Sequence, residues 1–202
     1  MAVKFAKPGK GLGKRVLLYG SPGVGKTSVA MIAPGPIAFF DLEKSVGNLM
    51  RGELPIDLVE AETFGEILAA LREIKAFDPY QSIVIDSLSA LEIKAAQHVL
   101  ATIPDDKGRR VQRIEDYGFG KGFTYLVEAF TNQLLPALQG LADAGKNIIL
   151  IGHESLTDVP SPTGNEDWKK YEPSLYASKT GKAHNRGEVV AWCDAVVCYR
   201  DW

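Results

Sequence analysis

The residues with the clearest chemical purpose form a glycine-rich segment near the N-terminus, Gly20-Ser21-Pro22-Gly23-Val24-Gly25-Lys26-Thr27-Ser28. The segment matches the pattern G-x-x-x-x-G-K-[ST], which forms a phosphate-binding loop when a strand precedes it and a helix follows it. Its glycines allow the backbone to wrap around a phosphate, so that the N–H groups point inward. We expect Lys26 to neutralise the outer phosphates and the Thr27 hydroxyl to ligate Mg²⁺. The segment therefore predicts a nucleotide site.

A carboxylate that could share the Mg²⁺ ion follows the most strand-like stretch of the chain. Asp86 ends the apolar run SIVID, so it should lie at the carboxyl edge of a central strand. A carboxylate there can hold Mg²⁺ through water. Asp86 could instead cap the helix that we expect to begin near Leu88, because aspartate is favoured at that position.

Two further acids follow the apolar run IAFFDL, which begins at Ile37. Glu43 lies just beyond the predicted strand, where a carboxylate could polarise the water that attacks the last phosphate. Asp41 competes for this role, and either acid could simply be a solvated loop residue. The residue types alone do not decide which of the two acids activates the water.

His153 follows the apolar run NIILIG. A histidine in such a run is usually a core residue, but this one should lie at the ligand edge of the sheet. From there its side chain could contact the last phosphate and report hydrolysis to the next loop. His98 and His184 carry no comparable argument.

The elements that position these residues alternate between strands and helices. We expect strands at 15–19, 37–42, 55–61, 82–87, 147–152 and 195–200. Helices are predicted after Lys26, from an N-cap at Thr63 to about 75, over 88–101, and over 123–145 with a kink at Pro136. Polar loops are expected at 103–122 and 155–187. Continuously apolar strands between helices indicate an α/β fold with a mostly parallel central sheet, helices on both faces and one domain over 1–202.

Charge is unevenly distributed although the formal net charge is only −2. The segments 1–15, 107–113 and 169–186 hold five, four and five of the 23 Lys and Arg residues, against the single acid Glu172. This segregation, including a basic arm at 1–14, favours a localised anionic partner. It could also serve only to keep these loops soluble.

Composition excludes several classes of protein. Hydrophobic residues make up 46% of the chain and charged residues 24%, which is typical of a globular protein. Apolar runs are too short to span a membrane, so we expect no membrane association. Cys193 and Cys198 lack the spacing of a zinc site or a disulfide framework. We therefore expect a cytoplasmic protein.

Taken in order, these motifs resemble the RecA-like P-loop ATPase core. GSPGVGKTS resembles its phosphate-binding loop, IAFFDLE the strand that ends in a water-activating glutamate, SIVIDSLSAL the metal-binding strand, and NIILIGHE the phosphate-sensing strand. The DYGFGKG segment and the IGHE sequence are most similar to RecA-core ATP-binding proteins of phages and prophages, which are implicated in single-strand annealing and recombination.

This resemblance implies an ATPase with Mg²⁺ as cofactor, Glu43 as catalytic base, Lys26 as phosphate ligand and His153 as sensor. It also implies that the loops 103–122 and 155–187 bind single-stranded DNA. The candidate contacts are Arg109, Arg110 and Arg113 in the first loop and Lys179, Lys182 and Arg186 in the second, with Tyr117, Phe119 and Tyr176 as aromatic residues that could stack on bases.

The resemblance further implies a ring-shaped or helical homo-oligomer with ATP at its subunit interfaces. A single-strand-binding protein is a further possible partner, and the setting would be a bacterial host cytoplasm. The F-x-x-A assembly motif of some relatives is absent, since Ala6, Lys7 and Pro8 follow Phe5.

Two other functions remain open from the sequence. A P-loop small-molecule kinase needs an arginine-bearing lid over the transferred phosphate, and residues 107–113 could serve as one. A nucleotide-switched DNA-binding module would keep the phosphate-binding loop without turning ATP over.

Overall fold

A mostly parallel β-sheet forms the centre of the protein. The computed structural model describes residues 11–48, 55–161, 164, 168–178 and 184–200. Within these residues the strands are β1 (Arg15–Gly20), β2 (Ile37–Asp41), β3 (Ile56–Leu58), β4 (Ser82–Asp86), β5 (Asn147–Val159), β6 (Trp168–Pro173) and β7 (Ala195–Cys198). The order across the sheet is β3-β2-β4-β5-β1-β7, with parallel pairing throughout, and β6 pairs antiparallel with β5. The predicted α/β class is confirmed.

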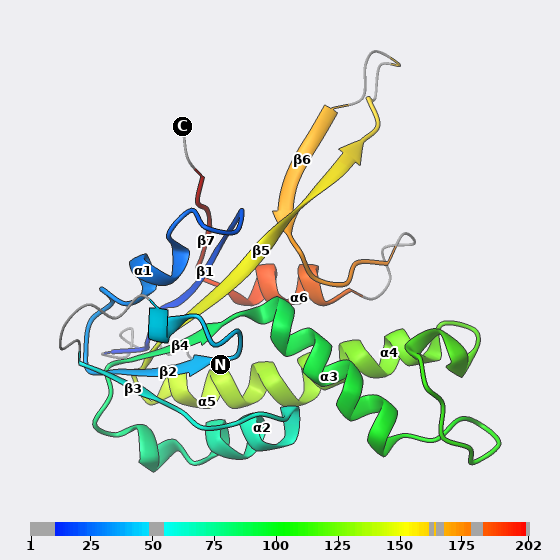
Figure 1. Cartoon of the computed structure of the whole chain (residues 1–202), viewed down its shortest axis with the longest axis horizontal. Helices are drawn as coiled ribbons and strands as arrows, with labels where there is room; N and C mark the ends of the chain where they lie inside the picture. The colour runs from blue at the N-terminus through cyan, green and yellow to red at the C-terminus, as the bar shows by residue number, and fades with distance from the viewer. Residues whose placement is uncertain (1–10, 49–54, 162–163, 165–167, 179–183, 201–202) are drawn as a thin grey trace, which may run out of the picture.

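Helices cover both faces of this sheet (Figure 1). The α-helices are α1 (Lys26–Ala30), α2 (Phe64–Arg72), α3 (Leu88–Thr102), α4 (Lys121–Glu128), α5 (Leu135–Asp143) and α6 (Asn185–Trp192). Short 3-10 turns occupy η1 (Val46–Asn48), η2 (Ile74–Phe77) and η3 (Ile114–Tyr117). Helices α2, α3 and α5 lie on one face, and α1 lies on the other.

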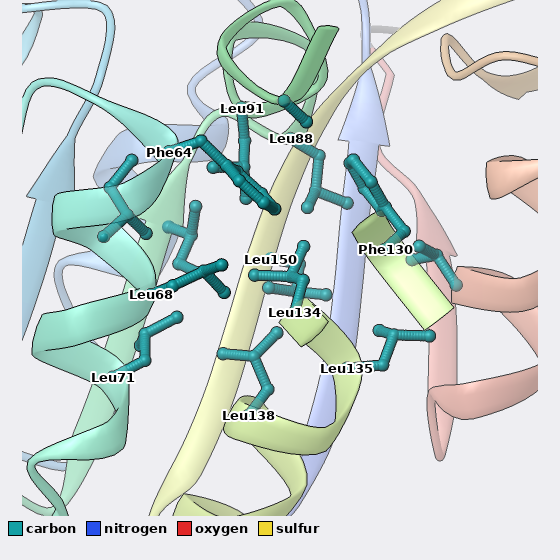
Figure 2. Packing of buried hydrophobic residues seen from close by; sticks show 14 of the residues in the cluster. Phe64, Leu68, Leu71, Leu88, Leu91, Phe130, Leu134, Leu135, Leu138 and Leu150 are labelled. Carbon is teal, nitrogen blue, oxygen red and sulfur yellow. The ribbon is translucent and has the colours of Figure 1, made fainter. Parts of the chain in front are cut away.

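The hydrophobic core is divided by the sheet into two clusters. The larger cluster includes buried residues of α2, α3 and α5, several of which are drawn in Figure 2. Successive strand residues point to opposite faces, so Phe40 joins this cluster while Phe39 joins the smaller cluster beneath α1. Burial on both faces explains why the strands read as continuous apolar runs.

Side chains that cap helices fix where two of the helices begin. The predicted N-cap at Thr63 is confirmed: its hydroxyl accepts the N–H of Glu66, whose carboxylate accepts the N–H of Thr63 in return. Ser87 caps α3 in the same manner by accepting the N–H of Ala90. That cap places α3 directly after β4.

The helix predicted over 123–145 is divided into three parts. A π-helical segment, Ala129–Leu134, separates α4 from α5, and Pro136 lies in the first turn of α5. Proline clashes with the carbonyl four residues earlier in a regular α-helix, and a wider turn before it relieves that clash. The chain therefore changes its helical pitch where a simple kink was expected.

The prediction of a loop over 155–187 is wrong for residues 155–159, 168–173 and 185–187, which lie in strands and a helix. β5 continues past the sheet to Val159 and forms a hairpin with β6 that projects from the body of the domain (Figure 1). Opposed pairs such as Leu156 with Tyr171 and Val159 with Trp168 stabilise this ribbon.

Among the described residues, none of the helices has the length and apolar character needed to cross a membrane.

Candidate active site

The carboxyl ends of four parallel strands bring the predicted site residues together. β5 lies between β1 and β4, and its register places His153 beside Gly20 and Ile151 beside Asp86. β2 lies on the other side of β4, with Asp41 opposite Asp86. Residues from four distant segments of the chain therefore meet at one edge of the sheet.

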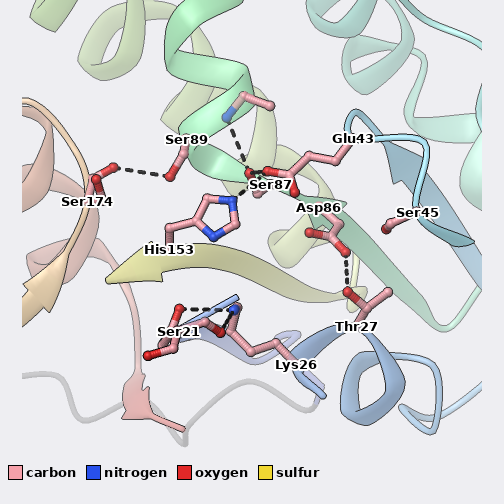
Figure 3. A network of polar contacts seen from close by, with 12 residues as sticks. Ser21, Lys26, Thr27, Glu43, Ser45, Asp86, Ser87, Ser89, His153 and Ser174 are labelled. Carbon is pink, nitrogen blue, oxygen red and sulfur yellow. Dashed lines mark hydrogen bonds and ion pairs between the residues drawn. The ribbon is translucent and has the colours of Figure 1, made fainter. Parts of the chain in front are cut away.

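The phosphate-binding loop connects β1 to α1 as predicted. Gly23 and Gly25 adopt left-handed backbone conformations, with φ of 81° and 96°, that other residues rarely adopt. The buried Lys26 side chain lies under the loop, where its Nζ donates to the carbonyl oxygens of Gly20 at 2.9 Å and Ser21 at 2.7 Å (Figure 3). Burial lowers the pKa of Lys26, while the nearby Asp86 carboxylate acts in the opposite direction.

Thr27 and Asp86 form a pair of oxygen donors beside the loop. The Thr27 hydroxyl donates to Asp86 Oδ2 at 2.6 Å, and burial raises the pKa of Asp86. No cluster of three His, Cys, Asp or Glu side chains suited to a metal ion occurs in the described part of the chain. Mg²⁺ in nucleotide sites commonly uses few protein ligands and takes the rest from phosphates and water. The hydroxyl and carboxylate found here fit that requirement.

Glu43 and Asp41, which the sequence left as competitors, have different environments. Asp41 accepts the N–H groups of Ser45 at 2.9 Å and Val46 at 3.0 Å, so it stabilises the turn η1. Glu43 instead lines the pocket: its Oε1 accepts the hydroxyl of Ser87 and lies 2.8 Å from His153 Nε2. Of the two acids, Glu43 is the one whose carboxylate faces the phosphate-binding loop.

His153 faces the same pocket from the end of the sheet-forming part of β5. Its Nε2 contacts Glu43, while its Nδ1 is buried with no hydrogen-bond partner. A pocket of about 340 Å³ lies between these groups. It is lined by Pro22, Gly23, Gly25, Lys26, Thr27, Ser28, Glu43, Ser45, Asp86 and His153.

Two polar residues of this region were not anticipated from the sequence. Ser87, which follows Asp86, bonds to Glu43, and Glu154, which follows His153, accepts the hydroxyl of Ser21. The Oε2 atom of Glu154 also lies 3.7 Å from Nε of Arg200, which follows β7. In the sequence, the only indication that these two residues belong to the site was that each directly follows a predicted site residue.

The residues predicted to contact DNA in the first loop lie beyond the far end of α3. Arg109, Arg110 and Arg113 are exposed there, and Arg109 forms an ion pair with Asp105 at 2.8 Å. Among the described residues, no ion pair engages Arg110 or Arg113.

In the second region, Lys179 and Lys182 lie outside the described residues. Arg186 belongs to α6 rather than to a loop, and it forms an ion pair with Glu172 on β6. Its guanidinium is largely covered, with the Nε atom buried and unpaired. The prediction that Arg186 lies in a loop is therefore wrong, and its side chain holds the hairpin against α6.

The three aromatic residues predicted to stack on bases lie in different environments. Tyr117 is 6% exposed and donates its hydroxyl to the carbonyls of Val99 and Ile103, so it is a core residue and that prediction is wrong. Tyr176 is half-buried and stacks on Phe123, with the ring centroids 4.5 Å apart. Phe119 is fully exposed.

A parallel α/β sheet with this loop, lysine and strand-end aspartate defines a P-loop NTPase. A family model described as "AAA domain" matches residues 12–200, so the chain belongs to that family. No curated protein matches the chain. The family and the fold together establish a nucleotide-binding NTPase domain.

Proposed function

We propose that this protein is a Mg²⁺-dependent ATPase in which Glu43 activates the attacking water. One observation carries the proposal: Lys26, the Thr27–Asp86 pair, Glu43 and His153 all border the same 340 Å³ pocket. That set supplies a cation for the phosphates, oxygen donors for a metal and a carboxylate for a proton. The family match supports NTPase activity in general, and ATP is the nucleotide that we assign.

Each of these residues would have a separate task. Lys26 would exchange its two backbone carbonyl partners for phosphate oxygens, and Thr27 with Asp86 would hold Mg²⁺. When bound, Mg²⁺ would offset the negative charge of the phosphates. Glu43 would accept the proton of the water, and His153 would contact the terminal phosphate.

The exchange of Glu43 for Gln tests the proposal, because it preserves size and removes the basic carboxylate. ATP should bind with unchanged affinity by calorimetry while turnover falls by about 100-fold or more. Asp41→Asn is the matched control: it alters the neighbouring acid, which contacts η1 instead of the pocket. A large loss in Asp41→Asn with none in Glu43→Gln would contradict the assignment.

The structure argues against a small-molecule kinase that uses residues 107–113 as its lid. Those residues follow α3, which begins beside the pocket and runs for 15 residues. A helix of that length extends about 22 Å. The arginines would therefore have to travel a long way to reach a transferred phosphate.

We further propose that the protein binds single-stranded DNA and promotes annealing or recombination as a ring-shaped or helical homo-oligomer. The observation that favours this is an exposed Trp168-Lys169-Lys170 sequence on β6, with Trp168 54% exposed. Lys170 also pairs with Glu172 at 3.0 Å, but its side chain is 55% exposed, whereas the Arg186 side chain on the same carboxylate is 18% exposed. Aromatic rings beside lysines suit single strands, since bases stack and phosphates pair with cations. Arg110 and Arg113 would provide a second set of contacts. Subunit interfaces would lie at the open side of the nucleotide pocket.

Fluorescence anisotropy with a labelled oligonucleotide at several salt concentrations tests DNA binding. Lys169→Ala/Lys170→Ala should weaken binding and reduce the salt slope by about 1.4, since each phosphate contact on a single strand contributes about 0.7. The control is Arg72→Ala/Lys75→Ala, which removes two exposed charges from another face. If both double variants weaken DNA binding equally, the loss reflects overall charge and not contacts at Lys169 and Lys170. That result would contradict the assignment of β6 as a DNA-binding strand.

A further inference from the structure

Ser87 carries a buried hydroxyl that contacts Glu43, one of the residues that line the pocket, and the phosphate-binding motif does not account for it. It follows Asp86 at the end of β4, is 0% exposed, and its Oγ accepts the N–H of Ala90 at 3.2 Å. The single hydrogen of the hydroxyl is then available to Glu43, whose Oε1 lies within hydrogen-bonding distance (Figure 3). The direction of this hydrogen bond is therefore defined: Ser87 donates and Glu43 accepts.

The Glu43 carboxylate is held through only one of its two oxygens. Oε1 contacts both Ser87 Oγ and His153 Nε2, the latter at 2.8 Å. No described residue donates a hydrogen bond to Oε2. Glu43 itself lies on the loop after β2, where a long side chain would otherwise sample several rotamers. The two contacts orient the carboxylate and leave Oε2 available to a water molecule.

We propose that Ser87 is a positioning residue, which fixes the Glu43 carboxylate so that Oε2 faces the attacking water. The proposal rests on the proposed function, because it takes Glu43 to be the base. Misplacing a catalytic group by about 1 Å can cost about 100-fold in rate, so a hydrogen bond to an otherwise mobile carboxylate has a large effect.

Hydrogen bonds of residues further along α3 fix the start of that helix, and with it the position of Ser87. Ser89 donates its hydroxyl to the carbonyl of Ser174 at 3.2 Å. One turn later the Glu92 carboxylate accepts the N–H of Tyr176 at 2.9 Å and the side-chain amide of Asn185 at 2.6 Å. The start of α3 is thereby attached to the segment that follows the hairpin, and the Ser87 hydroxyl is held in place.

Steady-state kinetics and ATP binding of Ser87→Ala and Ser87→Thr test this role. Ser87→Ala should lower kcat by about 10- to 100-fold, as expected for loss of a hydrogen bond to a charged group, while the Kd for ATP stays unchanged. Ser87→Thr retains the hydroxyl and should recover most of kcat. If Ser87→Ala keeps the wild-type kcat, or if Ser87→Thr recovers none of it, the proposal is overturned.

Loss of the α3 cap must be separated from loss of the contact to Glu43. Thr63→Ala removes the equivalent cap from α2, and it should lower thermal stability by a similar amount without changing kcat. A fall in kcat in Thr63→Ala as large as that in Ser87→Ala would overturn the proposal.

A double-mutant cycle with Glu43→Gln provides the second readout. Once Glu43 has lost its basicity, Ser87→Ala should cause little further loss of kcat. Additive losses would show that Ser87 acts independently of Glu43 and would overturn the positioning role alone. Full turnover in Glu43→Gln by itself would overturn the proposed function and this inference together.

Discussion

Most polar side chains around the nucleotide pocket form hydrogen bonds with other groups of the protein. Lys26 donates to two carbonyl oxygens of its own loop, Thr27 donates to Asp86, and Ser87 donates to Glu43. Buried polar groups that lack partners are costly, and these contacts remove most of that cost. A nucleotide bound beside Lys26 would therefore replace these two carbonyl contacts with phosphate oxygens.

Asp86→Asn should stabilise the nucleotide-free protein while it removes Mg²⁺-dependent ATP binding. Because burial raises the pKa of Asp86, the folded protein favours the protonated acid, and its ionised form at neutral pH opposes folding. The stability contribution of this group is greatest at low pH and declines as pH rises through the folded-state pKa. A gain of about 1 kcal/mol would raise Tm by about 2–4 °C in a domain of this size.

Calorimetric melting at pH 7 measures this effect, with Asp41→Asn as the comparison. Asp41 accepts two backbone N–H groups, so its replacement should lower Tm. A lower Tm for Asp86→Asn would show that the carboxylate is well solvated or compensated in the folded state, and the argument from burial would be wrong.

At the scale of single elements, steric space around helical glycines decides how they respond to substitution. Gly65 in α2 has no atom within 4 Å of the place where a Cβ would lie. Gly122 in α4 would place its Cβ 2.1 Å from the carbonyl oxygen of Ile114 and 2.7 Å from the ring of Tyr117. The close approach of α4 to η3 therefore depends on the missing side chain.

Gly65→Ala and Gly122→Ala should change stability in opposite directions. Alanine exceeds glycine in helix propensity by up to about 1 kcal/mol, so Gly65→Ala should raise the free energy of unfolding by about 0.5–1 kcal/mol. Gly122→Ala forces α4 away from η3, and overpacking of this kind costs about 1–3 kcal/mol. Urea unfolding of both variants provides the measurement, and a stabilised Gly122→Ala would contradict the packing described for α4.

At the scale of the whole molecule, a polar cluster joins the last strand to the body of the domain. Arg15 at the start of β1 forms an ion pair with Asp194 at 2.7 Å and donates to Gln139 of α5 at 2.9 Å. Trp192 of α6 donates to the same Gln139 oxygen at 2.9 Å. Asp194, which directly precedes β7, is thereby bonded to the first residue of β1, and the two strands also pair along their length.

Stability should fall in acid through the Arg15–Asp194 pair. Hydrogen bonds from Arg15 hold the pKa of Asp194 at about 2, below its ordinary value of about 3.9. A depressed carboxylate pKa stabilises the fold above the unfolded-state value, and this contribution is lost as pH falls from about 4 to about 2. Asp194→Asn should therefore lower Tm near pH 6, with a difference from wild type that shrinks toward pH 2.

Glu62→Gln is the control, because it breaks the Lys44–Glu62 pair in which both side chains are more than 80% exposed. Such pairs contribute little, so Tm should not change at any pH. A difference for Asp194→Asn that stays constant between pH 6 and pH 2 would rule out the ion pair as its cause.

Local sequence was sufficient for the fold class and for most of the pocket. The phosphate-binding loop, the apolar runs and the polar residue after each run are local patterns, and the carboxyl ends of parallel strands necessarily share one edge. Asp86, Glu43 and His153 could therefore be nominated together. The capping box at Thr63 was readable for the same reason, since its contacts span only three residues.

Only the tertiary structure decided which side chains face one another. Whether Asp41 or Glu43 lines the pocket depends on how the chain turns after β2, and the partner of Glu43 is Ser87, 44 residues away. Arg186 and Tyr117 looked available in sequence but contact Glu172 and the α3 backbone instead. The hairpin formed by β5 and β6 depends on cross-strand pairs such as Leu156 with Tyr171. These outcomes depend on packing between distant segments, and local composition and spacing do not encode such contacts.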